Sequence, residues 1–130
     1  MTPEAEAFFN KSEALLERAP ALLAQGFADE AGRAAYLAAF HAAQGLIFER
    51  TARSPKTHSG VHAEFARLSK DEPSIGIECR STLGRLYALK AIVDYETGPS
   101  AHVGAAQAAE AVSAARRFIA IVKEVATRTA

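Results

Sequence analysis

The sequence predicts an all-α protein that folds as one domain, residues 1–130. About thirty of the 130 residues are alanine and none is tryptophan, and alanine has the highest intrinsic helix propensity. Apolar residues recur at helical spacing between short breaks that contain proline and glycine. The chain is too short for two ordinary domains and its links are short, so we expect an antiparallel, up-and-down bundle of about five helices.

Start and stop signals set the expected helix boundaries. Thr2 and Pro3 are the residue types favoured at an N-cap and at the first helical position, and Gly26 is typical of a helix end. Pro20 lies inside that first span and predicts a kink or a break, because proline lacks a backbone donor. Asp29 is expected to cap the second helix. The expected ranges are Pro3–Gln25, Glu30–Ala52, His58–Lys70, Ile75–Tyr95 and, after the turn TGPS, Ala101–Ala126.

Charge and cysteine content exclude several classes of protein. Fifteen basic and fifteen acidic residues cancel, which argues against a strongly basic nucleic-acid-binding protein but not against a local basic groove. The single cysteine, Cys79, allows no intrachain disulfide and lies on an apolar stripe, so we interpret it as a buried small hydrophobic residue. The N-terminal residues lack the positive region of a signal peptide, and no run of about 18 apolar residues occurs. We expect a cytoplasmic protein with no membrane contact and no DNA partner.

The expected second helix carries apolar or very small residues on all sides, which predicts a central position in the bundle. Tyr36, Phe40 and Ile47 lie on one half, whereas the other half is almost entirely alanine and glycine. Small residues allow close approach of a neighbouring helix or of a partner subunit. Arg33 stands on the apolar side, so its guanidinium must reach solvent, pair with a carboxylate or face a ligand.

The expected fourth helix offers a carboxylate for that arginine. Arg80, Tyr87 and Asp94 recur at seven-residue spacing along one edge of its apolar stripe. Asp94 also follows Lys90 by four residues, so it is placed to pair with Lys90 in its own helix or with Arg33 across the bundle. We expect Arg33 and Asp94 to lie close together in a polar pocket or a buried support network. Tyr36, Tyr95 or His41 is expected close by.

The most basic stretch of the chain, residues 50–62, follows the second helix. Its cations sit beside a helix start, where free N–H groups favour anions, so it predicts either a phosphate contact or a solvated loop. His58 and His62 have the i, i+4 spacing of two metal ligands, but Ser59 replaces the glutamate of the H-E-x-x-H pattern and no third ligand is obvious. We therefore expect no metal and no cofactor. The basic and histidine residues of this stretch are Arg50, Arg53, Lys56, His58 and His62.

Three short motifs follow one another along the chain. The first is Arg33-x-x-Tyr36-x-x-x-Phe40-His41, the second is Lys56-Thr57-His58-Ser59-Gly60, and the third is Val93-Asp94-Tyr95. Their order and spacing in an alanine-rich helical chain resemble the HEPN family of small prokaryotic helical proteins, over roughly residues 10–125. The chain departs from the nearest subgroup at Leu37, Lys90 and Val93, where that subgroup often has Tyr, Arg and Ala.

The resemblance implies a helical bundle that often dimerises, and two alternative functions. Many HEPN proteins are metal-independent endoribonucleases whose motif is an Arg, four to six residues and then a His, a spacing that Arg53 and His58 meet. Others are partners of small nucleotidyltransferases in toxin and antitoxin pairs, or bind nucleotides without cutting RNA. We expect a non-catalytic, homodimeric module that binds a nucleotidyltransferase partner or a nucleotide or RNA phosphate, and the ribonuclease is the alternative. The candidate ligand-binding residues are Arg33, Tyr36, His41, Arg53, Lys56, His58, Asp94 and Tyr95.

Under the ribonuclease alternative, the chemistry follows from the two residue types. An unperturbed histidine has a pKa of about 6.5, so His58 would take the proton of a ribose 2′-hydroxyl. Arg53 or Lys56 would stabilise the negative charge on the phosphate. This reaction requires no metal ion.

Overall fold

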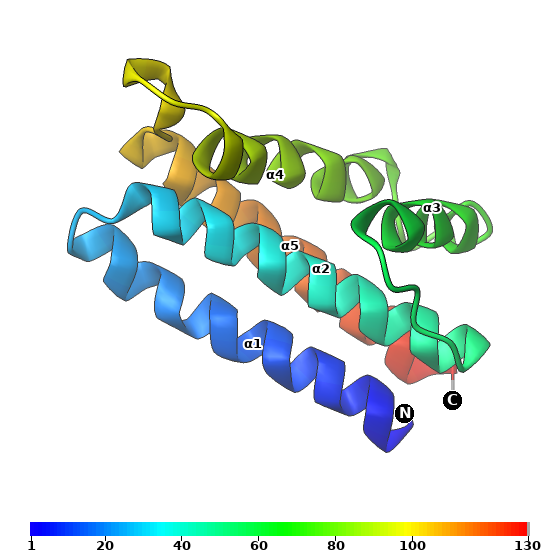
Figure 1. Cartoon of the computed structure of the whole chain (residues 1–130). Helices are drawn as coiled ribbons and strands as arrows, with labels where there is room; N and C mark the ends of the chain where they lie inside the picture. The colour runs from blue at the N-terminus through cyan, green and yellow to red at the C-terminus, as the bar shows by residue number, and fades with distance from the viewer. Residues whose placement is uncertain (130) are drawn as a thin grey trace.

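The computed structural model describes residues 1–129, which form five α-helices, one short 3₁₀ helix and no strand (Figure 1). The predicted all-α class is therefore confirmed. Within these residues, no helix is both long enough and apolar enough to cross a lipid bilayer. The elements are α1 (Pro3–Ala24), α2 (Ala28–Thr51), α3 (His58–Ser69), α4 (Ile77–Tyr95), η1 (Pro99–Ala101) and α5 (Ala105–Thr129).

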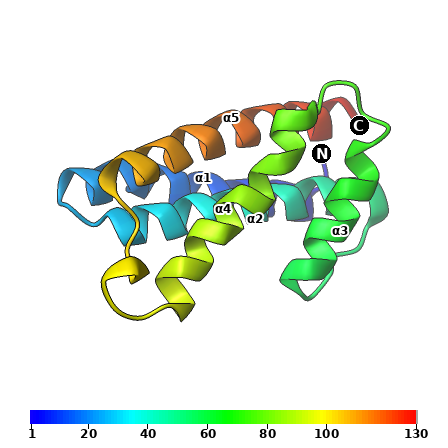
Figure 2. The same cartoon turned by 90° about the horizontal axis from the view of Figure 1, so that it is seen from above.

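The four long helices alternate in direction along the chain. α1 and α2 run antiparallel, α4 returns against α2, and α5 runs in the same direction as α2 (Figure 1). The short α3 lies at the end of the bundle where both chain termini are found. Viewed from above, α3 and α4 lie across the same side of α2, which places the residues of the second and third motifs next to those of the first (Figure 2).

α2 is the central helix, as the sequence predicts, because it contacts each of the other four α-helices. Its small residues allow close packing within the chain. The hydroxyl of Ser12 in α1 donates to the carbonyl oxygen of Ala38 at 2.6 Å, and a Cβ added at Gly45 would lie 2.6 Å from the ring of Phe9. The sequence allows the Ala/Gly side to pack against a neighbouring helix or against a partner subunit. The structure shows that it packs against a neighbouring helix of the same chain.

α1 runs without interruption through Pro20, so the predicted break is wrong. Pro20 is exposed, whereas Leu16 and Ala19 before it are buried in the bundle core. Water can therefore satisfy the carbonyl group that lacks a proline N–H, and packing on both sides of the proline keeps the helix continuous. The helix ends one residue earlier than expected, before Gly26, whose φ of +83° suits glycine.

Asp29 does not cap α2, which is a second correction. The helix begins at Ala28 after Phe27, and no side chain caps it. The carboxylate of Asp29 instead accepts hydrogen bonds from the backbone N–H of Val103 at 2.7 Å and from Nδ1 of His102 at 2.8 Å. These bonds fix the segment before α5, so α5 starts at Ala105 rather than at Ala101 as expected. α4 likewise starts two residues late, at Ile77 after Gly76.

Candidate functional site

The three motifs found in the sequence meet on one side of α2. α3 and the second half of α4 lie over that side (Figure 2), and the Tyr36 ring lies 5.3 Å from the Tyr87 ring and 5.7 Å from the His58 ring, centroid to centroid. We call the polar residues that gather there the motif cluster. They are Arg33, Tyr36, His58, His62, Tyr87, Lys90 and Asp94.

The hydroxyl group of Tyr36 lies between two histidines of α3. Its oxygen is 2.7 Å from Nδ1 of His58 and 2.9 Å from Nε2 of His62. The i, i+4 spacing places both imidazoles on the same side of α3, which faces α2. Tyr36 is fully buried, so these two bonds satisfy a hydroxyl that would otherwise be costly to bury.

The surroundings of this trio favour uncharged side chains. Burial lowers the pKa of both His58 and His62. The positive charge of Lys90 lowers the pKa of His58 further, and His58 does the same to His62. Burial raises the pKa of the Tyr36 hydroxyl. Near neutral pH the two imidazoles are therefore mainly neutral and the phenol keeps its proton.

Aromatic rings hold the two imidazoles in place. The ring of Phe40 lies 4.5 Å from the ring of His58, and the ring of Tyr87 meets the ring of His62 edge-on at 5.5 Å. Within residues 1–129, no group of three His, Cys, Asp or Glu side chains is arranged to hold a metal ion. The ring nitrogens of His58 and His62 that point toward α2 are already bound to Tyr36.

Both ion pairs considered for Asp94 are present. Its carboxylate accepts from Lys90 Nζ at 2.7 Å and lies 3.4 Å from Arg33 Nε. Lys90 is almost completely buried, and its ammonium group lies 5.9 Å from the Tyr87 ring and 5.5 Å from the Tyr95 ring. The hydrogen bond from Lys90 holds the pKa of Asp94 below its ordinary value. Arg33 is half exposed, so it is the outer and weaker of the two partners.

His41 lies beside the motif cluster without bonding to it. Its Nδ1 is 2.7 Å from Oε1 of Gln44, in the same helix. Its ring packs edge-on against Phe40 at 5.6 Å, and burial lowers its pKa. The structure therefore brings Arg33, Asp94 and Tyr36 together as expected, with Tyr95 at the edge, and adds His58, which was not expected there. His41 contacts the ring of Phe40 and not a member of the cluster.

Arg53 and His58 do not share a cavity. Arg53 lines a hollow of about 590 Å³ between the end of α2, the α2–α3 loop and α3, together with Glu64 and Arg67. His58 lines a different hollow, of about 260 Å³, with Ser59, His62 and Tyr87. We call this second one the histidine hollow. The two residues of the ribonuclease spacing therefore open onto separate parts of the surface.

Arg53 and Lys56 are both exposed on the loop that joins α2 to α3. The other cation of the larger hollow, Arg67, forms an ion pair with Glu64. In the part of the chain that the structure describes, no carboxylate lies within ion-pairing distance of Arg53 or Lys56. These two charges are therefore available to an external partner.

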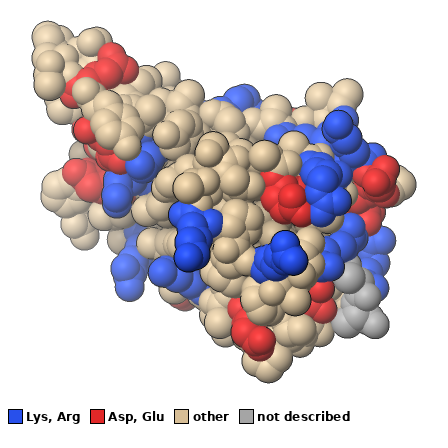
Figure 3. All heavy atoms as spheres, turned by 45° about the vertical axis from the view of Figure 1, so that its right-hand side comes forward, with Lys and Arg blue, Asp and Glu red and all other residues tan. Residues whose placement is uncertain are grey.

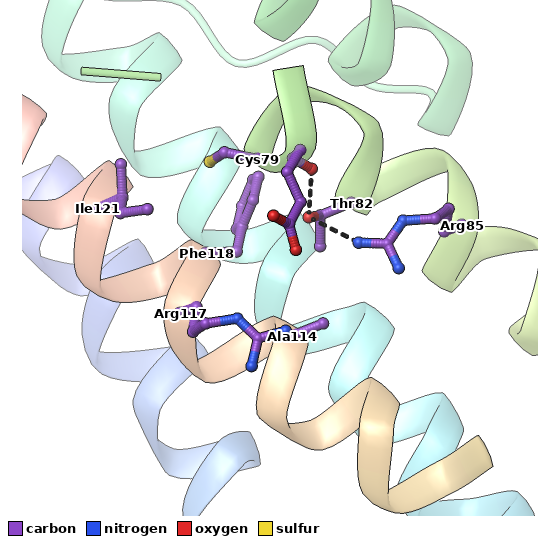
Figure 4. A pocket seen from close by; sticks show the side chains of 8 residues that line it. Cys79, Thr82, Arg85, Ala114, Arg117, Phe118 and Ile121 are labelled. Atoms are coloured by element: carbon purple, nitrogen blue, oxygen red, sulfur yellow. Dashed lines mark hydrogen bonds between the residues drawn. The ribbon is translucent and has the colours of Figure 1, made fainter. Parts of the chain in front are cut away.

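A third hollow, of about 100 Å³, lies between α4 and α5 (Figure 4). Cys79 and Phe118 contribute apolar surface, and the guanidinium groups of Arg85 and Arg117 lie at its side. Cys79 is buried, as predicted, and burial raises the pKa of its thiol to about 11. None of the residues predicted to bind a ligand lines this hollow.

The charged residues are mixed over the face that carries the end of α2 and α3. Lys and Arg side chains alternate there with Asp and Glu and with uncharged surface (Figure 3). A broad basic surface of the kind that covers many phosphates is not present on this face. Any contact with phosphate must therefore be made by a few neighbouring side chains, as the zero net charge also indicates.

Three members of the motif cluster were not among the predicted ligand-binding residues. The sequence presents His62 as one residue of the basic stretch and as half of an incomplete metal-ligand pair, Tyr87 as part of one edge of an apolar stripe, and Lys90 as a partner of Asp94. A buried tyrosine needs a partner for its hydroxyl, and a pair of histidines on one helix face could supply it. That signal was in the sequence at Tyr36, His58 and His62.

Comparison with known protein families gives a match to the HEPN domain over residues 5–125. No match was found among proteins with curated descriptions. The matched range includes all three motifs and nearly the whole bundle. The chain belongs to the HEPN domain family.

Proposed function

We propose that the chain is a non-catalytic binding module that forms a homodimer and contacts a small nucleotidyltransferase in a toxin and antitoxin pair. Arg53, Lys56 and His58 supply the contact, either with an acidic protein surface or with a phosphate-bearing group of a nucleotide or RNA. The two exposed, unpaired cations on the α2–α3 loop support this role, because they add charge to a surface that is otherwise mixed in sign.

The observation that carries the proposal is the separation of Arg53 from His58. A catalytic pair that acts on one phosphodiester must converge on it, with the base within hydrogen-bond reach of the 2′-hydroxyl. Here the two side chains line different hollows. One ring nitrogen of His58 is also bound to Tyr36. This arrangement favours binding over cleavage within one chain.

The test for catalysis uses purified protein with structured and unstructured RNA in EDTA, next to His58→Ala and Arg53→Ala. We expect the RNA to stay intact. The lowered pKa of His58 keeps its ring neutral, as a general base must be. The ribonuclease alternative therefore predicts that the RNA is cleaved in EDTA. Cleavage that survives chelation and disappears in both variants would establish the metal-independent endoribonuclease and reject the binding module.

The test for the partner is capture from the native cell followed by mass spectrometry. We expect a small nucleotidyltransferase among the captured proteins. Lys56→Glu should weaken that association more at low salt than at high salt, because screening removes the charge effect. Lys11→Glu, on the exposed side of α1, is the matched control and should leave it unchanged. Equal loss in both variants would contradict a contact through Lys56.

The Ala/Gly side of α2 is already covered by helices of the same chain. The homodimer is therefore proposed from the family resemblance and not from that side. Light scattering at high micromolar concentration tests it. We expect a species of twice the 13.8 kDa chain mass. A single species of the chain mass would reject the dimer.

A further inference from the structure

The hydroxyl group of Tyr36 links the protonation of His58 to that of His62. A phenol has one proton to donate, yet its oxygen is within hydrogen-bond distance of a ring nitrogen from each histidine. Tyr36 must donate to one of these nitrogens and accept an N–H from the other. When both rings are neutral, the remaining nitrogens of the two rings are therefore complementary: one carries a proton and the other does not.

The remaining ring nitrogens are Nε2 of His58 and Nδ1 of His62. Within the described residues neither has a hydrogen-bond partner, and no buried side-chain nitrogen or oxygen there lacks one. Both atoms must therefore be accessible. Both rings line the histidine hollow, next to the hydroxyl-bearing side chains of Ser59 and Tyr87.

One added proton changes what this pair presents. If His58 takes the proton, its Nδ1–H donates to the Tyr36 oxygen, the Tyr36 O–H donates to His62, and Nδ1 of His62 keeps its own hydrogen. Both accessible nitrogens are then donors and the trio carries one positive charge. A second proton is opposed, because the Tyr36 O–H would lose its acceptor and the two charged rings would repel each other.

The charged groups around the trio leave that positive charge without a partner. α4 contributes Tyr87, Lys90 and Asp94, and α2 contributes Arg33 and His41. The carboxylate of Asp94 is already bound to Lys90 and to Arg33. The histidine hollow has no acidic side chain in its lining. An anion entering from solvent would supply the missing charge.

We propose that Tyr36, His58 and His62 form a phosphate-binding site that takes up one proton from solvent together with the anion. This inference rests on the proposed role in holding a phosphate-bearing group and names the residues and the proton that go with it. The two ring N–H groups donate to phosphate oxygens, and Tyr36, which does not reach the ligand, positions both rings. The low pKa of both histidines in the free protein makes the proton uptake depend on the anion.

The first experiment needs no ligand and follows the imidazole NMR signals of both histidines through an acid titration. We expect the two rings to share the uptake of a single proton. In Tyr36→Phe, which keeps the ring and removes the hydroxyl, we expect two independent titrations. Independent titrations in the unaltered protein would overturn the coupling, whatever the protein binds.

The second experiment measures binding by calorimetry in buffers that differ in heat of ionisation. The probes are inorganic phosphate, adenosine monophosphate and dimethyl phosphate, and the last has no proton that titrates near neutrality. Near neutral pH we expect uptake of about one proton for each dimethyl phosphate bound, and almost none at a pH where the trio is already protonated. Preference for the monophosphate would indicate a nucleotide, and equal binding of the diester would indicate an RNA backbone.

Variants separate this inference from the proposed function. Tyr36→Phe should reduce the proton uptake, because without the hydroxyl each neutral ring can place its own N–H toward the ligand, and His62→Leu should weaken binding about tenfold or more by removing a donor to a charged group. Thr82→Val also removes a buried hydroxyl, one that lines the hollow between α4 and α5, and should change neither. Circular dichroism confirms that each variant is folded.

Phosphate binding that needs Arg53 and Lys56, takes up no proton and is unchanged in His62→Leu would overturn the inference and leave the proposed function intact. Proton-linked binding that is unchanged in Arg53→Ala and Lys56→Glu would support the inference and overturn the phosphate contact that the proposed function assigns to these two residues. Absence of phosphate binding would overturn the inference, while capture of the nucleotidyltransferase decides the proposed function separately.

Discussion

Gly45 of α2 faces the ring of Phe9 in α1 so closely that a Cβ at position 45 would lie 2.6 Å from that ring. Phe9 is fully buried, so the ring has little room to move. We expect Gly45→Ala to lower the free energy of unfolding by about 1 kcal/mol or more, since overpacking outweighs the gain in helix propensity. Chemical denaturation measures the change.

At Gly84 in α4, the same substitution is expected to have the opposite effect on stability. This glycine is exposed, and apart from its chain neighbours and the adjacent backbone of its own helix, no atom lies within 4 Å of a Cβ built there. Gly84→Ala should raise the free energy of unfolding by about 0.5–1 kcal/mol, because the chain loses less entropy on folding. If both glycine variants shift stability in the same direction, the close contact between α1 and α2 does not control the effect.

The carboxylate of Asp94 pairs with the buried ammonium group of Lys90 and with the exposed guanidinium group of Arg33. Asp94→Asn leaves Lys90 without its carboxylate, and we expect a loss of about 2 kcal/mol. Arg33→Ala should change stability by less than about 1 kcal/mol, because Arg33 is half exposed and Lys90 still pairs with Asp94. A larger loss would require Arg33→Ala to leave Asp94 unpaired, which its bond to Lys90 prevents.

A double-mutant cycle tests whether Lys90 is a stronger partner of Asp94 than Arg33 is. Lys90→Met combined with Asp94→Asn should be less destabilising than the sum of the two single changes. The coupling between Arg33 and Asp94 should be much smaller. Equal coupling for both pairs would show that Arg33 is as strong a partner as Lys90.

The sequence predicted the central position of α2, because apolar or small residues on all sides leave a helix no exposed face. It could not predict the role of Asp29. The residues bound to Asp29 are His102 and Val103, which lie more than 70 positions later in the chain. A local cap was the nearest explanation for an aspartate at a helix start, and only the packing of α5 beside α2 reveals the longer-range bond.

The motif cluster was predicted in part for a similar reason. The pair of Arg33 with Asp94 follows from a charge on the apolar side of a helix, which needs an opposite charge nearby. The contact of Tyr36 with both histidines of α3 depends on the angle at which α3 lies across α2 (Figure 2). Helical spacing places residues on a face, but it does not say which helix that face meets.

Cys79 should be almost unreactive in the folded protein. Its thiol is buried and burial raises its pKa to about 11, so the reactive thiolate is scarce near neutral pH. We expect a thiol reagent to modify Cys79 slowly in buffer and rapidly in denaturant. Fast modification without denaturant would show that the hollow between α4 and α5 opens readily.

Stability should decline as the pH falls from about 6.5 toward 5. His41, His58 and His62 each have a folded-state pKa below the ordinary value, so protonation favours the unfolded chain. This contribution is complete above the unfolded pKa of about 6.5 and is lost as the pH falls toward the folded values. Carboxylates such as Asp94, whose pKa is also lowered, lose their contribution only below about pH 4, so the two effects separate.

The measurement is urea denaturation at several pH values in that range. Each histidine that stays neutral in the folded protein adds up to about 1.4 kcal/mol of stability for each pH unit. His62→Leu removes one titrating ring and should flatten the curve between about pH 6.5 and 5. Because Tyr36 would still donate to His58, the variant should remain folded at neutral pH. A slope that stays unchanged in His62→Leu would show that this ring is not held neutral by its burial against Tyr36 and Tyr87.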